Sequence, residues 1–159
     1  MHEISHFLNI IPKKWKQSNY FMYFCSLNLR KIINMRIRHQ SENPEQLVAT
    51  IVEAMDSLKG KEIVTLDLRE TGTAVTDYFV ICHANSKTQV DAIAEKVIDE
   101  TLKKNGVKPY HIEGRDNTEW ILIDFVDVVV HVFLQSMRKY YQLEELWADA
   151  ERIVNSAEE

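Results

Sequence analysis

The sequence predicts a mixed α/β domain in which a five-stranded sheet is flanked by helices. Apolar residues recur at helical spacing in three stretches, and between them lie short runs that alternate or are continuously apolar, as strands do. Two of these runs are joined so closely that they must be antiparallel neighbours. With 159 residues, of which 45% are apolar and 27% charged, the chain is long enough to bury one core.

The first helix is predicted over residues 43–60. Asn43 stands before Pro44, and Gln46 follows three residues after Asn43, which is the pattern of a side-chain cap with a proline in the first turn. Gly60 ends the helix. One buried stripe is predicted along it, formed by Leu47, Val48, Ile51, Met55 and Leu58.

Two strands and a second helix come next. Residues 63–68 alternate along a strand, whereas residues 78–82 are continuously apolar and therefore belong in the middle of the sheet. Residues 71–76 form the loop between these strands. A capping box at residues 86–89 then opens a helix that ends at Gly106.

The last third of the chain predicts three more strands and a third helix. The strands cover residues 108–113, 119–125 and 128–134, and the tight turn at residues 124–127 makes the last two antiparallel. The final helix is predicted over residues 137–154. One side of it should be buried, through Leu143, Leu146, Trp147, Ala150, Ile153 and Val154.

The first 40 residues differ from the rest in charge, because they hold seven Lys or Arg and one Glu. They follow no sustained period and hold no apolar stretch of the roughly 20 residues that a membrane span needs. We predict a basic, disordered leader over residues 1–40 and one domain over residues 41–159. Two alternatives stay open: residues 1–34 are a transit peptide that directs the protein to an organelle, or translation begins at Met35.

The domain after the leader is acidic, with a formal charge of about −11 against −5 for the whole chain. A phosphate backbone repels such a surface, so we expect a basic protein as its partner and no direct nucleic-acid contact by residues 41–159. Cys25 and Cys82 match no zinc or disulfide spacing, which indicates a reducing compartment. We predict neither a cofactor nor a metal.

Six blocks of sequence carry a resemblance to a known family. They are Asp77-Tyr-Phe-Val-Ile-Cys, Gln89-Val-Asp-Ala-Ile-Ala, Glu113-Gly, Trp120-Ile-Leu-Ile-Asp124, Asp127-Val-Val-Val-His-Val-Phe133 and Arg138-Lys-Tyr-Tyr-Gln-Leu-Glu-Glu-Leu-Trp147. In this order they resemble the ribosomal silencing factor (Iojap) family, over about residues 43–150.

The resemblance implies a nucleotidyltransferase-like mixed sheet without the catalytic motif, and a homodimer. It also implies binding to a large-subunit ribosomal protein on the subunit-joining face, the one numbered fourteen. A protein bound there would block the small subunit by steric occlusion and repress translation. The implied location is the bacterial cytoplasm.

Four residues are predicted to bind the partner. Trp120 and Leu122 share one face of their strand, so they form an apolar patch if the opposite face is core. The alternative is that a helix covers Trp120 as well. Arg138 and Tyr141, near the start of the last helix, are predicted at the rim of the patch. His131 and Phe133 are predicted to be core or dimer-contact residues, and not metal ligands.

Two other functions stay open from the sequence. A nucleotidyltransferase needs two acids one residue apart on a strand, after a glycine-serine turn, and the sequence has no such motif. Asp124 and Asp127 are explained by the hairpin turn, while His111 and Glu113 are two possible metal ligands without a third. The other alternative is an RNA-binding ribosome biogenesis factor that uses the basic leader.

Overall fold

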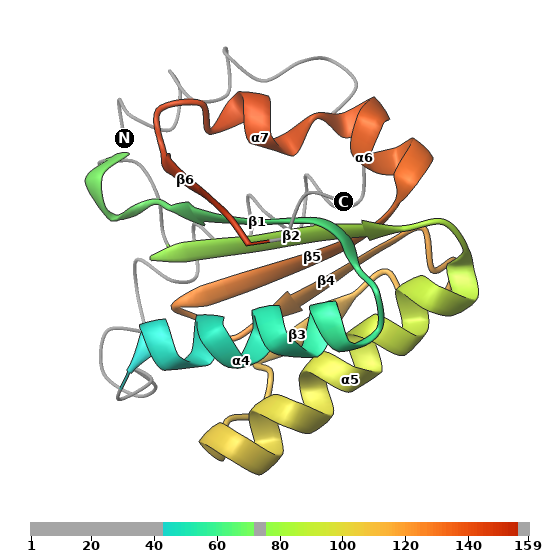
Figure 1. Cartoon of the computed structure of the whole chain (residues 1–159), viewed down its shortest axis with the longest axis horizontal. Helices are drawn as coiled ribbons and strands as arrows, with labels where there is room; N and C mark the ends of the chain where they lie inside the picture. Colours follow the sequence, from blue (N-terminus) through green and yellow to red (C-terminus); the bar gives the residue numbers. More distant parts are fainter. Residues whose placement is uncertain (1–42, 72–75, 156–159) are drawn as a thin grey trace.

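The structure of the protein is a computed structural model, which describes residues 43–71 and 76–155. The predicted leader lies outside these residues. The described chain forms an open sheet with helices on both faces (Figure 1). Its helices are α4 (Pro44–Ser57), α5 (Lys87–Asn105), α6 (Gln135–Tyr141) and α7 (Leu143–Leu146), with a 3-10 turn at Arg69–Thr71. Its strands are β1 (Lys61–Asp67), β2 (Tyr78–Ala84), β3 (His111–Glu113), β4 (Trp120–Asp124), β5 (Val128–Leu134) and β6 (Glu151–Val154).

The sheet is mixed, as the sequence predicted, and its strand order is β3-β4-β5-β2-β1-β6. The central strands β2 and β5 run parallel, with Tyr78 opposite Val128 and Ala84 opposite Leu134. The other neighbouring pairs of the described sheet are antiparallel. Both central strands are almost entirely buried, which agrees with their continuously apolar sequences.

Helices α4 and α5 cover one face of the sheet (Figure 1). Each begins at the predicted cap: the Asn43 side chain accepts a hydrogen bond from the Gln46 amide at 3.0 Å, and that of Ser86 accepts one from Gln89 at 3.2 Å. Helix α5 ends at Gly106, whose φ of 66° lies in the left-handed region that glycine adopts at little cost. The predicted starts of both helices and the end of α5 are therefore confirmed, whereas α4 ends at Ser57, before the predicted Gly60.

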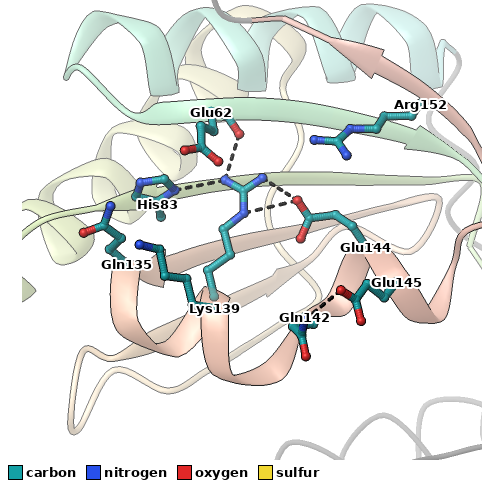
Figure 2. A pocket seen from close by; sticks show the side chains of 9 residues that line it. Glu62, His83, Gln135, Lys139, Gln142, Glu144, Glu145 and Arg152 are labelled. Atoms are coloured by element: carbon teal, nitrogen blue, oxygen red, sulfur yellow. Dashed lines mark hydrogen bonds and ion pairs between the residues drawn. The ribbon is translucent and has the colours of Figure 1, made fainter.

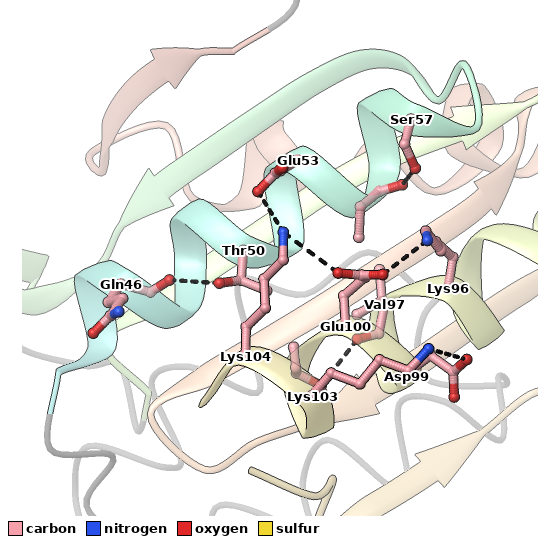
Figure 3. A network of polar contacts seen from close by, with 12 residues as sticks. Gln46, Thr50, Glu53, Ser57, Lys96, Val97, Asp99, Glu100, Lys103 and Lys104 are labelled. Atoms are coloured by element: carbon pink, nitrogen blue, oxygen red, sulfur yellow. Dashed lines mark hydrogen bonds and ion pairs between the residues drawn. The ribbon is translucent and has the colours of Figure 1, made fainter. Parts of the chain in front are cut away.

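On their exposed side, charged residues of α4 and α5 form ion pairs with one another (Figure 3). The Lys104 Nζ lies 2.9 Å from a Glu53 carboxylate oxygen on α4 and 3.4 Å from one of Glu100 on α5. Lys96 lies 2.8 Å from the other Glu100 oxygen, and its hydrogen bond is the main cause that lowers the pKa of Glu100. Exposed pairs of this kind contribute little stability.

The opposite face is covered by α6 and α7, which lie on the other side of the sheet from α4 and α5 (Figure 1). Side chains alternate along each strand, so Ile121 and Ile123 face α4 and α5 while Trp120 and Leu122 face the other way. The second core therefore differs from the first in being rich in aromatic residues. It contains Val64, Leu66, Leu68, Phe79, Ile81, Trp120, Leu122, Val129, Phe133, Leu143 and Trp147.

The prediction of one helix over residues 137–154 is wrong, and so is the count of five strands. Helix α6 ends at Tyr141, its C-cap Gln142 has a left-handed φ of 52°, and the chain then forms the short α7. Residues Glu151–Val154 form the sixth strand, which pairs with the edge of β1. Ile153 and Val154 are 45% and 57% exposed, because pairing with an edge strand does not bury them as a helix would have done.

No described helix is long and apolar enough to cross a lipid bilayer.

Candidate functional site

An aromatic cluster lies on the face of the sheet that α6 and α7 cover. Strands β4 and β5 place Trp120 opposite Phe133, and the two rings stack with centroids 4.7 Å apart. Tyr141, at the end of α6, lies with its ring 4.9 Å from that of Trp120. Phe79 and Trp147 meet edge to face at 5.6 Å on the same side. Such contacts add to the stability that burial of the rings supplies.

His131 lies within this cluster and is fully buried. The Trp120 indole N–H donates to its Nδ1 at 3.2 Å, so Nδ1 is an acceptor and the ring is neutral with its proton on Nε2. Burial lowers the pKa of His131 to about 3, which keeps it neutral at physiological pH. Within residues 43–71 and 76–155, no three His, Cys, Asp or Glu side chains are placed to hold a metal. His131 and Phe133 are both fully buried, so they are core residues of this chain.

The prediction that Trp120 and Leu122 form an exposed apolar patch is wrong. These side chains are 2% and 0% exposed and belong to the second core. The chain turns back after β5, and this brings Tyr141, Leu143 and Trp147 onto the face where both side chains point. The alternative weighed from the sequence, in which the last helical segment covers Trp120, is the arrangement found. Neither residue presents a free surface to a partner.

Arg138 was expected at a solvent-exposed rim, and the structure places it in the interior, with 6% of its surface exposed. Its Nη1 donates to the Glu62 carbonyl at 2.8 Å and to the His83 Nδ1 at 3.1 Å. Its Nη2 and Nε donate to a Glu144 carboxylate oxygen at 2.5 and 3.2 Å. Figure 2 shows Glu62, His83 and Glu144 surrounding this guanidinium. We call Arg138 with these three partners the Arg138 clamp.

A bulge in β1 supplies the backbone part of the clamp. The register between β1 and β2 shifts between Lys61 and Val64, and Glu62 has a φ of 47° in the left-handed region. The carbonyls of Lys61 and Glu62 both accept from Arg138 Nη1, at 3.4 and 2.8 Å. The strained residue is therefore held in place by a charged donor, which ties α6 to the start of β1.

A pocket of about 250 Å³ opens beside the clamp (Figure 2). Charges of both signs line it, and the described lining contains no Ser, Thr or Cys side chain that could act as a nucleophile. Its walls come from β1, β2, α6, α7 and β6. The lining residues are Glu62, His83, Gln135, Arg138, Lys139, Gln142, Glu144, Glu145 and Arg152.

Two tyrosines follow Arg138 at the end of α6, near the molecular surface. Tyr140 is exposed on α6, and its ring meets that of the half-buried Tyr141 edge to face at 5.1 Å. Tyr141 lies between the Trp120 ring and the surface, and its part in binding a partner stays a prediction. The outer side of α6 therefore presents an aromatic group that the second core supports from behind.

Asp124 and Asp127 form hydrogen bonds in and beside the turn between β4 and β5. Asp124 Oδ1 accepts from the Val126 amide at 2.8 Å, and Val126 has a φ of 79° in the tight turn between β4 and β5. Asp127 accepts through its carbonyl from the amides of Asp77 and Tyr78. The interpretation of Asp124 as a turn residue is confirmed, and Asp127 lies in the same turn and bonds there through its backbone. His111 and Glu113 bond to each other at 2.7 Å on the short β3.

Comparison with known proteins assigns this arrangement to a family. A protein-family model described as "Ribosomal silencing factor during starvation" matches residues 41–159. The chain belongs to the ribosomal silencing factor family. The predicted resemblance is confirmed, and with it a ribosome-associated role in silencing translation.

Individual relatives of this ribosomal silencing factor agree with the assignment. The ribosomal silencing factor RsfS of Bacillus subtilis is 43% identical over 108 residues, which are 68% of this chain and 90% of that protein. Protein Iojap of Arabidopsis thaliana, named as chloroplastic, is 40% identical over 78 residues, 49% of this chain and 32% of that protein. A crystal structure of a Chromobacterium violaceum protein superposes with a TM-score of 0.63 and 33% identity, covering 72% of this chain and 94% of the other.

Proposed function

We propose that this ribosomal silencing factor binds the large ribosomal subunit and prevents the small subunit from joining by occupying its place. The family match over residues 41–159 is the observation that carries the proposal. The action would be steric, with no substrate transformed. The Asp124 carboxylate is bonded within the hairpin turn, and the described pocket lining has no Ser, Thr or Cys side chain, which fits a protein that works by binding.

The proposed partner is a basic protein of the large subunit, the ribosomal protein numbered fourteen on the subunit-joining face. The acidic charge of the domain favours association with a basic surface and speeds the encounter. Tyr140 and Tyr141 on α6 supply an aromatic surface for the contact, and Trp120 and Leu122 support it from the core. We further propose a homodimer in the bacterial cytoplasm. Location in an organelle would require residues 1–34 to act as a transit peptide.

Co-sedimentation with purified large subunits tests the proposed function. We expect the protein to pellet with large subunits, and we expect small subunits added afterwards to form fewer complete ribosomes than in a control without the protein. Adding the protein to ribosomes that are already joined is the matched control, and there the effect should be weaker because the site is occluded. Normal joining in the presence of bound protein would contradict the steric mechanism, and nucleotide turnover with magnesium would favour the enzyme alternative.

Removing residues 1–34 separates the proposed function from RNA binding by the leader. We expect the shortened protein to keep its affinity for large subunits within about threefold, because the acidic domain makes the contact. Loss of the five basic residues of this segment, against its one Glu, should abolish binding if the leader held RNA through its phosphates. Titration of both proteins into large subunits at two salt concentrations measures the difference, since phosphate contacts weaken steeply with salt.

A further inference from the structure

We infer that His83 is a positioning residue for the ribosome contact: it accepts the hydrogen bond that orients Arg138, and Arg138 in turn fixes the α6–α7 segment that carries Tyr141. The inference rests on the proposed function for the role of that segment. It adds a residue that lies at the end of β2 and has no direct part in the contact. Its basis is the geometry of the Arg138 clamp.

The hydrogen bond between His83 and Arg138 has only one possible direction. A guanidinium can donate and cannot accept, so the 3.1 Å contact between Arg138 Nη1 and His83 Nδ1 requires a lone pair on Nδ1. The His83 ring is therefore neutral and carries its proton on Nε2. Both side chains are buried, and removal of the Nδ1 acceptor would leave an N–H of a buried cation without that partner.

The α6–α7 segment depends on such tertiary contacts for its position. Helix α6 has seven residues and α7 has four, and neither has a side-chain cap at its N-terminus. Helices this short are not stable by themselves in water. Arg138 joins α6 to β1 through Glu62, to β2 through His83 and to α7 through Glu144. Release of one of these bonds should loosen the whole segment.

Protonation of His83 would have the same effect as removing the acceptor. Arg138 and Lys139 face His83 from α6, and Lys61 and Glu62 face it from β1. Burial, and next the charge of Arg138, lower the pKa of His83 below its ordinary 6.5. The unfolded chain therefore takes up this proton more readily than the folded protein. The stability that His83 contributes is complete above about pH 6.5 and is lost as the pH falls from there through the lowered pKa.

Two substitutions at His83 test the inference. In His83→Phe the ring is kept and the acceptor is lost, whereas in His83→Asn the amide oxygen can accept from Arg138 and does not titrate. In the His83→Phe variant, the amide protons of residues 135–146 should exchange with solvent about tenfold faster than in the wild type. This variant should also bind large subunits at least about threefold more weakly. His83→Asn should retain both properties and lose the decline of binding that we expect of the wild type as the pH falls below about 6.5. His111→Phe, at a half-exposed histidine on β3, is the matched control.

The outcomes distinguish this inference from the proposed function. Wild-type exchange and wild-type binding in His83→Phe would overturn the inference, as would a pH profile of His83→Asn that is as steep as that of the wild type. If His83→Phe does not fold, the pH profile of His83→Asn decides. If wild-type protein ignores large subunits at every pH, the proposed function fails, and the exchange rates of residues 135–146 still decide whether His83 holds the segment.

Discussion

Replacing Trp120 with alanine should lower the free energy of unfolding by about 3–5 kcal/mol, because it removes a large buried ring from the aromatic cluster. The indole is 2% exposed, stacks on Phe133 and lies against Tyr141. The substitution also leaves the buried His131 Nδ1 without its donor, which adds a cost of its own. Urea unfolding followed by circular dichroism measures the change.

Two other variants separate the effects that Trp120→Ala combines. Trp120→Phe keeps most of the buried ring and loses only the N–H to His131, so we expect a smaller loss of about 1–2 kcal/mol. Tyr140→Ala, at an exposed position on α6, should change stability by no more than about 0.5 kcal/mol. If Trp120→Ala were as stable as the wild type but failed to bind large subunits, Trp120 would be an exposed contact, as its strand position first suggested.

Sequence patterns predicted the elements whose limits are set locally. Asn43 and Ser86 cap helices through contacts three residues away, and Gly106 ends α5 because the left-handed backbone there suits glycine. The continuously apolar β2 and β5 could be assigned to the centre of the sheet for a similar reason. Each of these features depends on a few neighbouring residues, which the sequence displays directly.

The end of the chain could not be predicted in this way, because it depends on what lies beside it in space. Ile153 and Val154 fit a helical stripe, and only the free edge of β1 turns them into a strand. Gln142 adopts a left-handed backbone conformation, which glutamine rarely does and which its residue type therefore does not predict. The alternation along β4 correctly placed Trp120 and Leu122 on one face, but it could not tell whether that face is covered.

The Arg138 clamp was missed for the same reason. Its partners come from a bulge in β1, from the end of β2 and from α7, and no spacing in the sequence connects Glu62, His83 and Glu144. Arg138 lies in the last turn of the seven-residue α6, where a basic side chain suits the helix dipole, so its position on the helix gave no sign of a buried partner. Its partners are Glu144 and the two carbonyls of the bulge, which lie inside the protein.

Replacing Arg138 with alanine should therefore destabilise the fold by about 3 kcal/mol, as removal of one member of a buried ion pair does. The Glu144 side chain is mostly buried and would keep its charge without a counter-ion, and the carbonyls of Lys61 and Glu62 would lose their donor. Thermal unfolding should show a lower midpoint, and limited proteolysis should cut first near Gln142, where α6 ends.

A double substitution and a neighbouring residue make this expectation specific to the clamp. Arg138→Met combined with Glu144→Gln removes the uncompensated carboxylate, so it should recover part of the stability that either change alone removes. Lys139 lies next to Arg138 on the exposed side of α6, so Lys139→Ala should change the unfolding free energy by no more than about 0.5 kcal/mol. If Arg138→Ala and Lys139→Ala were equally stable, Arg138 would belong at a solvent-exposed rim, and its loss would weaken ribosome binding without loosening α6 and α7.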